Sequence, residues 1–173
     1  MNDTNKQEPN TSKQKAVFLD RDGVINRLEL GKYTTSWEKF EFLDGVIPAI
    51  AKLNKAGFLV IIITNQSAIN RGLMSTQELV EIHMRMLTEI EKGGASVDAI
   101  YYCPHAPDEG CDCRKPKVGM FNQVNGDYMI DYPNSWFVGD FESDREVAEK
   151  VGLKFILAKG DGGLRKAVDI ILK

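Results

Sequence analysis

Two aspartates separated by a single residue follow a short apolar run near the start of the chain. Asp20 and Asp22 come directly after residues 16–19, and Gly23 permits a sharp backbone turn at this point. Two carboxylates this close together could bind one metal ion or divide catalytic labour between them. A simple polar turn is the alternative, because Asp and Gly are ordinary loop residues. The pair by itself is therefore only a hypothesis.

Five short apolar runs predict β-strands, and segments with helical apolar periodicity lie between them. This alternation is typical of parallel strands joined by crossover helices, so we expect an α/β fold with a central parallel sheet. The predicted strands cover residues 16–19, 58–63, 99–102, 135–138 and 154–157. The shorter predicted helices cover residues 117–125, 142–151 and 164–172.

Two longer helices are predicted from their end signals and apolar stripes. Gly57 is a C-terminal stop for the first, and Ser75 with Glu78 makes a capping box for the second. The stripes consist of Val46, Ala49, Ile50 and Leu53 in the first helix and of Leu79, Ile82, Met86 and Ile90 in the second. His83 lies on or beside the second stripe without a partner motif, so we expect a packed structural histidine there.

A residue capable of chemistry directly follows, or ends, each of the first four predicted strands. These residues are Asp20, Thr64, Cys103 and Asp140. In open parallel sheets, ligands bind in the crevice at the carboxyl ends of the strands. We therefore expect these four positions to converge on one edge of the sheet.

The polar clusters resemble, in order, the four motifs of the haloacid dehalogenase (HAD) superfamily. Residues 17–26 resemble the first motif, 62–65 the second, Lys115 within Arg114-Lys115-Pro116 the third, and Gly139-Asp140 with Asp144 the fourth. The resemblance implies a HAD-like Rossmannoid three-layer sandwich with a central parallel sheet and no cap domain. One departure is Val24, where many members have threonine.

The resemblance also implies a Mg²⁺-dependent phosphatase. Asp20 would attack phosphorus and form an aspartyl-phosphate, and Asp22 would protonate the leaving alkoxide and then activate water. Mg²⁺ would be held by the side chains of Asp20 and Asp140 and by the backbone carbonyl of Asp22. Its charge is needed because an anionic nucleophile and a phosphate dianion repel each other.

Donors for the substrate follow the second and third motifs. By resemblance, Thr64 and Asn65 would bind the phosphoryl oxygens, and Lys115 would place a positive charge beside them. Gln66, Ser67 and Arg114 complete the predicted substrate-binding set.

Asp144 lies four residues after Asp140, on the same face of a helix. There it could touch a metal-bound water, stabilise the helix dipole or pair with Arg145. These alternatives stay open, and we leave Asp144 outside the predicted site.

A second cluster gathers all three cysteines and one of the two histidines. Cys103, His105, Cys111 and Cys113 form the pattern C-x-H-x5-C-x-C, which would complete a closed tetrahedral zinc site. A disulfide plus a spare thiol is the alternative, but a bridge between Cys111 and Cys113 would be strained. Because no ligand position is left open, the Zn²⁺ would be structural, stiffening the loop that delivers Arg114 and Lys115.

The zinc motif followed by Arg114-Lys115-Pro116 resembles the bacterial D-glycero-D-manno-heptose 1,7-bisphosphate phosphatases, which remove the 7-phosphate. Histidinol-phosphate phosphatases share this motif, and the segment from Gln66-Ser67 to Arg71-Gly72 favours the heptose enzymes. The expected partner is thus a small sugar bisphosphate. With no room for a cap, residues 27–37 would act as the lid. Tyr33 and Trp37 are candidate walls, although ordinary packing suits Trp37 better.

Length and composition agree with one globular domain. The 173 residues are 43% hydrophobic, and 22 Lys and Arg against 25 Asp and Glu give a net charge of -3. Residues 1–14 contain only Met1 as a large apolar side chain, so we expect a disordered tail and a single folded domain over residues 15–173.

Composition also limits which partners and which cellular location we expect. The acidic balance is atypical of nucleic-acid binding, and no segment resembles a signal peptide or a membrane span. We expect a cytoplasmic monomer that binds neither nucleic acid nor membrane. A non-catalytic, zinc-stabilised binding module is the alternative class. The combination of Asp20, Asp22, Thr64, Lys115 and Asp140 disfavours it, since binding alone needs no such set.

Overall fold

The computed structural model describes residues 12–28 and 31–173. Five parallel strands form one sheet in the order β3-β2-β1-β4-β5. The strands are β1 (Ala16–Leu19), β2 (Leu59–Asn65), β3 (Ala99–Cys103), β4 (Trp136–Gly139) and β5 (Lys154–Leu157). Strand order reverses on either side of β1, which makes its carboxyl end a natural ligand crevice.

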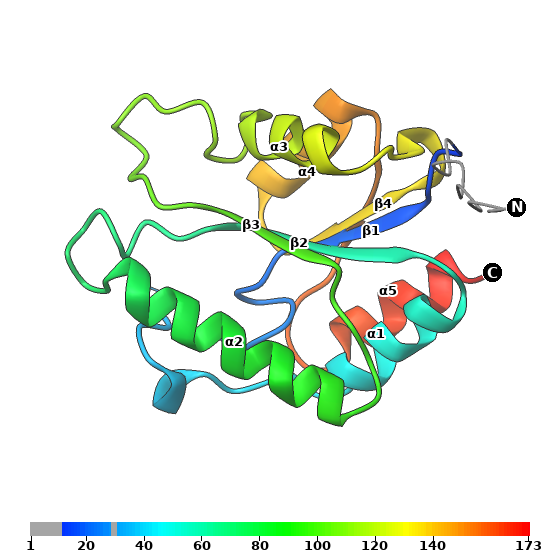
Figure 1. Cartoon of the computed structure of the whole chain (residues 1–173), viewed down its shortest axis with the longest axis horizontal. Helices are drawn as coiled ribbons and strands as arrows, with labels where there is room; N and C mark the ends of the chain where they lie inside the picture. The colour runs from blue at the N-terminus through cyan, green and yellow to red at the C-terminus, as the bar shows by residue number, and fades with distance from the viewer. Residues whose placement is uncertain (1–11, 29–30) are drawn as a thin grey trace, which may run out of the picture.

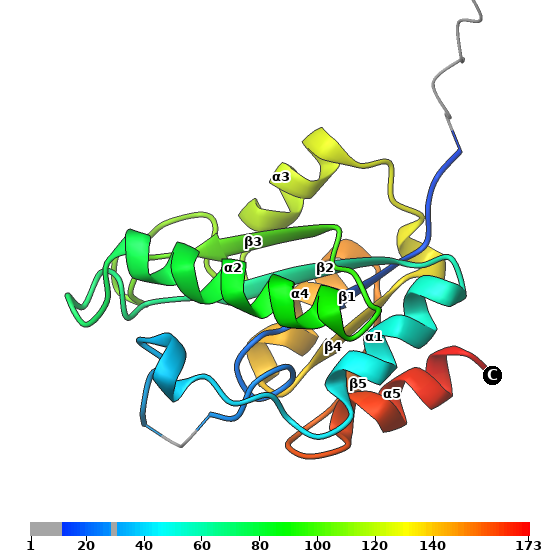
Figure 2. The same ribbon diagram turned by 60° about the horizontal axis from the view of Figure 1, so that its bottom comes forward.

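Helices cover both faces of the sheet and complete a three-layer sandwich (Figure 1). One face carries α3 (Gly119–Asp127) and α4 (Glu142–Val151), and the other carries α1 (Val46–Lys55), α2 (Thr76–Lys92) and α5 (Gly163–Ile171). Figure 2 shows α1 and α5 side by side. The short 3-10 helices are η1 (Trp37–Lys39) and η2 (Tyr132–Asn134).

Alternating side chains of the central strands supply two apolar cores. Val17 and Leu19 of β1 pack towards α1, α2 and α5, whereas Ala16 and Phe18 pack towards α3 and α4. All four are fully buried, as expected of a strand covered on both faces. The sheet is therefore a rigid platform for the residues that follow each strand.

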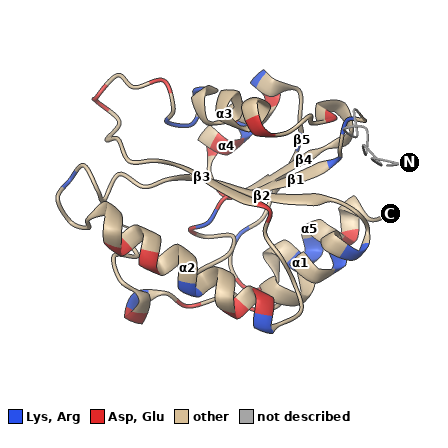
Figure 3. Cartoon of the chain, viewed as in Figure 1, with Lys and Arg blue, Asp and Glu red and all other residues tan. Residues whose placement is uncertain are grey.

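Local signals place the helices as predicted. Ser75 and Glu78 form the predicted capping box, with Glu78 N donating to Ser75 Oγ (3.2 Å) and Ser75 N donating to Glu78 Oε2 (2.7 Å). Gly57 adopts a left-handed φ of 79° just after α1. Figure 3 shows acidic and basic residues interspersed along α2, where Arg85–Glu81 and Lys92–Glu89 form ion pairs.

Several predicted boundaries shift by one or two residues in the structure, and two of these shifts have a clear cause. β2 extends to Asn65, because Thr64 and Asn65 continue the pairing with β3. α3 begins at Gly119 rather than at residue 117, since Lys117 N bonds Arg114 O (2.8 Å) in a tight turn and Gly119 N bonds Asp112 O (2.9 Å).

The predicted tail also ends earlier than expected. Gln14 accepts a hydrogen bond from Asp131 N and donates one to Met129 O, each 2.8 Å long, so it joins the fold. Residues 1–11 of the predicted tail lie outside the described residues. Among those described, no helix is both long and apolar enough to cross a membrane.

Candidate active site

The carboxyl ends of β1, β2 and β4 bring the predicted catalytic residues together around a small cavity. The cavity measures about 220 Å³, and seven of the eight predicted catalytic and substrate-binding residues line it, all except Thr64. It is lined by Asp20, Asp22, Leu28, Lys32, Tyr33, Thr34, Asn65, Gln66, Ser67, Arg114, Lys115, Phe141, Ser143 and Asp144. Thr64 and Asp140 lie at the adjoining strand ends rather than in this lining.

Asp20 is held by one of its two carboxylate oxygens. Oδ1 accepts a hydrogen bond from Arg21 N (2.8 Å) and lies 3.0 Å from Lys115 Nζ. Among the described residues, Oδ2 has no hydrogen bond in the structure, and Asp20 lines the cavity. Burial raises the pKa of Asp20 to about 7, with Asp144 and Asp22 adding to the rise and Lys115 opposing it. One oxygen is thus fixed and the other is available.

Lys115 is the buried cation at the centre of the site. Its Nζ donates to Ile63 O (2.8 Å) and forms ion pairs with Asp20 Oδ1 (3.0 Å) and Asp144 Oδ1 (2.7 Å). Burial alone would lower the pKa of Lys115, but the Asp20 and Asp144 carboxylates raise it above its usual value. The ammonium group therefore stays charged and anchored beside Asp20.

Asp144 belongs to the site, and the structure corrects its exclusion. The side chain is fully buried, and Oδ2 accepts hydrogen bonds from Asp140 N and Phe141 N, both 3.1 Å. Gly139 makes this approach possible, because a Cβ there would lie 2.4 Å from Asp144 Oδ2. Arg145 pairs instead with Glu142 (3.4 Å). Asp144 orients the Asp140 turn and holds Lys115.

The site has the donor set and the charge deficit of a hard divalent cation site. Asp20, Asp140 and Asp144 each offer an oxygen, and these atoms lie within 4.8 Å of one another. Three carboxylates against the one ammonium of Lys115 leave a deficit of two positive charges when all are ionised. Asp140 Oδ1 is buried without a hydrogen-bond partner among the described residues. Oxygen-rich sites of this kind suit Mg²⁺.

The raised pKa of Asp140 reflects the same shortage of positive charge. Burial, followed by repulsion from Asp144, raises its pKa to about 6. Gly23, with a left-handed φ of 87°, lets Asp140 approach, since a Cβ at this position would lie 2.2 Å from Asp140 Oδ2. Because Asp144 already serves Lys115 and two backbone N–H groups, Asp20 and Asp140 are the side chains left to face a cation.

Asp22 is surrounded by donors. Arg21 Nη2 donates to both of its oxygens (2.8 and 2.9 Å), Asn26 Nδ2 donates to Oδ1 (2.9 Å) and Gln66 Nε2 donates to Oδ2 (2.7 Å). Burial alone would raise the pKa of Asp22, but Arg21 and these hydrogen bonds lower it. In the free protein the side chain is therefore ionised and fixed in direction.

Two predicted phosphate ligands also bond to protein groups. Asn65 donates through Nδ2 to Lys115 O (3.2 Å) and accepts through Oδ1 from Lys115 N (3.0 Å). Gln66 Nε2 donates to Thr64 Oγ1 (2.9 Å) as well as to Asp22. Asn65 thus positions the backbone of Lys115, and Gln66 links Thr64 to Asp22. Ser67 lines the cavity as predicted.

The four predicted zinc ligands converge on one point. Cys103 Sγ lies 2.8 Å from Cys113 Sγ and 3.7 Å from Cys111 Sγ, and His105 Nδ1 lies 3.2 Å from Cys113 Sγ. All three cysteines are free thiols, and the four ligand atoms lie within 4.8 Å of one another. Three sulfurs and one imidazole nitrogen form a closed set that could hold a tetrahedral metal ion.

This Cys/His cluster is joined directly to the cavity. Arg114 Nη1 donates to His105 O (3.1 Å), and Arg114 lines the cavity. The next residue is Lys115. The cluster therefore contacts the loop that carries both cations.

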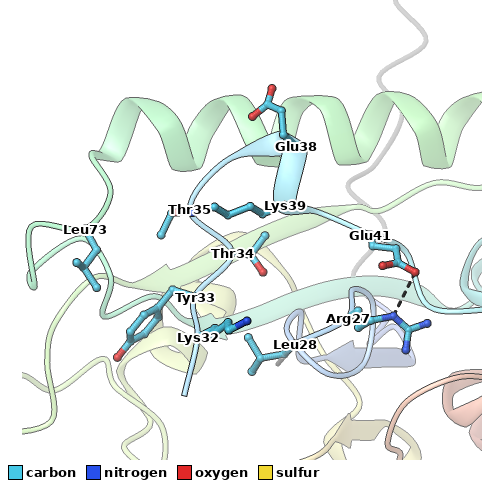
Figure 4. A pocket seen from close by; sticks show the side chains of 10 residues that line it. All are labelled: Arg27, Leu28, Lys32, Tyr33, Thr34, Thr35, Glu38, Lys39, Glu41 and Leu73. Atoms are coloured by element: carbon cyan, nitrogen blue, oxygen red, sulfur yellow. Dashed lines mark hydrogen bonds and ion pairs between the residues drawn. The ribbon is translucent and has the colours of Figure 1, made fainter. Parts of the chain in front are cut away.

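A larger cavity of about 660 Å³ adjoins the first (Figure 4). The predicted lid supplies most of its wall, and Leu28, Lys32, Tyr33 and Thr34 line both cavities. Tyr33 lines both cavities, as expected of a wall residue. Trp37 instead packs on Phe40, with the two ring centroids 5.0 Å apart. Residues 29 and 30 of the lid lie outside the described residues.

Replacing Lys115 with methionine should destabilise the protein strongly, because it leaves Asp20 and Asp144 buried without their shared cation. We expect a loss of about 3–5 kcal/mol in the free energy of unfolding at pH 7 without magnesium. Because Lys115 lowers the pKa of Asp20, the variant should hold the Asp20 proton to a higher pH than the wild type, so the loss should grow as pH rises above about 7. Chemical denaturation measures it. The control is Lys52→Met, which removes an exposed ion pair to Asp169. Equal effects of the two substitutions would contradict the prediction.

Comparison with known proteins agrees with this geometry. The family model described as polynucleotide kinase 3 phosphatase matches residues 15–159. The D-glycero-beta-D-manno-heptose-1,7-bisphosphate 7-phosphatase of Pseudomonas putida is 44% identical over 151 residues, which cover 87% of this chain and 86% of that protein. Its namesake from Pseudomonas aeruginosa is 42% identical over 149 residues, covering 86% and 83%.

Solved structures show the same relationship. The D,D-heptose 1,7-bisphosphate phosphatase of B. bronchiseptica, solved with magnesium and phosphate, superposes with a TM-score of 0.81 at 36% identity, covering 90% of this chain and 87% of the other. A putative HAD-like phosphatase from Mesorhizobium loti gives a TM-score of 0.80 at 26% identity, covering 92% and 86%. These neighbours confirm the predicted α/β fold of the HAD type.

Proposed function

This chain belongs to the polynucleotide kinase 3 phosphatase family, and we propose that it removes the 7-phosphate of D-glycero-D-manno-heptose 1,7-bisphosphate. The substrate is supported by relatives with 42–44% identity that carry this name and match most of the chain. The reaction is supported by one observation above all. Asp20 presents an available oxygen to a cavity that also contains an acid-base candidate and a buried cation.

In the first step, Asp20 Oδ2 attacks phosphorus and the bond from phosphorus to the sugar oxygen breaks. The leaving alkoxide takes a proton from Asp22 and departs as an alcohol, which leaves an aspartyl-phosphate. Asp22 is ionised in the free protein, so its proton must be gained as the substrate binds. The negative charge of an arriving phosphate favours this, because it raises the pKa of a neighbouring carboxylate.

In the second step, Asp22 takes a proton from water and the resulting hydroxide attacks phosphorus. The bond between phosphorus and Asp20 breaks, inorganic phosphate leaves and the carboxylate is restored. Lys115 and the Thr64 hydroxyl stand beside the phosphoryl group as charge and hydrogen-bond partners. Both steps thus use the same two carboxylates in turn.

Mg²⁺ is part of the proposal, and Asp20, Asp140 and the backbone carbonyl of Asp22 would hold it. No hydrogen bond within the described chain ends on that carbonyl. When bound, Mg²⁺ supplies the missing positive charge and polarises the phosphoryl oxygens. The solved relative with magnesium and phosphate supports this choice of ion.

We also propose structural Zn²⁺ in the Cys/His cluster of Cys103, His105, Cys111 and Cys113. Three thiol sulfurs favour a soft or borderline metal over Mg²⁺, and four protein ligands leave no open position for catalysis. The role of this ion is then to fix the loop that carries Arg114. The planar fork of that side chain suits the second phosphate or the hydroxyls of the sugar.

A phosphate-release screen tests the function. The substrates are both anomers of the heptose bisphosphate, histidinol phosphate, simple sugar monophosphates and a 3′-phosphorylated oligonucleotide, each with and without added Mg²⁺. We expect kcat/KM for one heptose bisphosphate anomer to exceed that for histidinol phosphate at least about 100-fold, because buried donors discriminate strongly against substrates that leave them unpaired.

The outcomes separate the parts of the proposal. A preference for histidinol phosphate or for the oligonucleotide would overturn the substrate but not the chemistry. Turnover that does not depend on Mg²⁺ would overturn the proposed requirement for this ion. No release from any phosphate ester would support the non-catalytic alternative.

A further inference from the structure

Arg21, the residue between the two aspartates, is fully buried and does not line the cavity. Its guanidinium binds Asp22 on one side through Nη2 and meets His83 on the other, with Nη1 3.2 Å from His83 Nε2. Its Nε lacks a partner among the described residues. Burial of a charged group with an unmatched donor is unfavourable, and an apolar side chain would often serve stability as well. The arrangement therefore calls for a reason beyond packing.

His83 is the structural histidine expected on α2, and its partner determines its chemical form. Arg21 has donors only, so Nε2 of His83 must accept and the imidazole proton must lie on Nδ1. Burial, together with the charge of Arg21, lowers the pKa of His83 to about 3, which keeps the ring neutral. The ring also meets Tyr102 of β3 edge-on, with centroids 6.1 Å apart. His83 is thus a neutral hydrogen-bond acceptor held in place between α2 and β3.

We propose that His83 is a positioning residue for proton transfer at Asp22, acting through Arg21. The hydrogen bond from Nη1 to His83 fixes the plane of the guanidinium. The Nη2 group then holds both oxygens of Asp22 and sets the direction of its carboxylate. This inference rests on the proposed phosphatase reaction, in which Asp22 must reach the leaving oxygen.

The other two hydrogen-bond donors to Asp22 are less suited than Arg21 to fix the direction of its carboxylate. Asn26 and Gln66 also donate to Asp22, but each is shared with other acceptors: Asn26 with Thr34 Oγ1 and Gln66 with Thr64 Oγ1. Gln66 and Thr34 line the cavity, where a ligand can compete for their hydrogen bonds. Neither Arg21 nor His83 lines it, so we expect their contact to persist when substrate enters.

The test is to replace His83 and compare two leaving groups. His83→Leu removes the acceptor, and His83→Gln restores one of similar reach. The readout is kcat/KM, which reports the step that releases the leaving group, for heptose bisphosphate and for p-nitrophenyl phosphate. The sugar alkoxide needs a proton to leave, whereas p-nitrophenolate does not.

We expect His83→Leu to lower kcat/KM for the sugar bisphosphate roughly 10-fold to 100-fold, within the range of a displaced general acid. The value for p-nitrophenyl phosphate should change less than about threefold. His83→Gln should recover most of the loss. Ile82→Val, next to His83 in the core of α2, is the control for a general loss of stability and should affect both esters equally and slightly.

Equal losses for the two esters in His83→Leu, or no recovery in His83→Gln, would overturn the positioning role while leaving the proposed function standing. If the wild type releases phosphate from neither ester, both proposals fail. If His83→Leu does not fold, the imidazole nitrogen resonances of the wild type decide. A proton on Nε2 at neutral pH would rule out the acceptor role.

Discussion

Asp20→Asn is expected to abolish phosphate release while the protein remains folded. Asparagine keeps the shape of the side chain but cannot act as a nucleophile, so kcat should fall roughly a thousandfold or more. Phosphate release at saturating substrate measures the loss, and circular dichroism checks the fold. Mass spectrometry of the quenched wild type should find one added phosphoryl group, which the variant should lack.

The matched control is Asp169→Asn, the same change at an exposed position on α5. It should leave kcat unchanged, since Asp169 pairs only with Lys52 on the surface. Normal turnover by Asp20→Asn would refute the role of Asp20 as nucleophile. A phosphoryl group found on another residue of the wild type would assign that role to the other residue.

The variant that loses activity, Asp20→Asn, should be more stable than the wild type. Without magnesium, the pKa of Asp20 is raised from 3.8 to about 7 in the folded protein, mainly by burial. The folded state then binds a proton more tightly than the unfolded state, so the Asp20 contribution to stability falls as pH rises from about 4 to 7. Asparagine does not titrate. Relative to wild type, Asp20→Asn should therefore gain on the order of 2–4 kcal/mol over this window.

Added Mg²⁺ should remove much of that gain, because the ion binds the wild-type carboxylates and stabilises only the folded state. Urea denaturation at several pH values, with and without Mg²⁺, measures both effects. A variant that loses stability relative to wild type as pH rises would show that Asp20 is not desolvated as the structure indicates.

Cys113→Ser is expected to release the bound metal and to destabilise the protein. Serine is a poor zinc ligand, so the Cys/His cluster should lose its metal, and loss of a structural zinc site should cost on the order of 3 kcal/mol or more. Activity should also fall, because Arg114 is tied to His105 O and Lys115 follows it. Elemental analysis of the purified protein gives the zinc content, and thermal unfolding gives the stability.

Asp112→Ser is the control, since it introduces the same residue into the same loop at an exposed position between two ligands. It should retain one zinc per chain and wild-type stability within about 0.5 kcal/mol. If Cys113→Ser keeps both its metal content and its stability, the structural zinc proposal is wrong.

Much of the site was predictable because the responsible signals are local. The apolar run of β1 followed by Asp20 and Asp22 needs only strand periodicity and a turn. The capping box of Ser75 and the close spacing of Cys111 and Cys113 are likewise read within a few residues. The order of the elements then implies a parallel sheet, whose geometry brings distant strand ends to one edge.

The partners of individual side chains could not be predicted in this way. Nothing in the sequence indicated that the amides of Asn65 and Gln66 also bond to Lys115 and to Asp22. An amide serves a ligand and a protein group equally well, so its choice depends on what the fold places within 3 Å or so. Asp144 was excluded for a similar reason, because its ion pair with Lys115 joins α4 to the loop before α3.

The sequence alone was therefore enough to predict the phosphatase reaction and the α/β architecture and to propose metal-binding residues, since each is encoded in short motifs and their order. Only the tertiary structure placed Asp144 beside Lys115 in the cavity and brought His83, which lies 62 residues from Arg21, against the guanidinium that binds Asp22. Motifs specify which groups are available. Burial and chain packing decide which of those groups meet, and a buried polar group must bond to whichever partner is there.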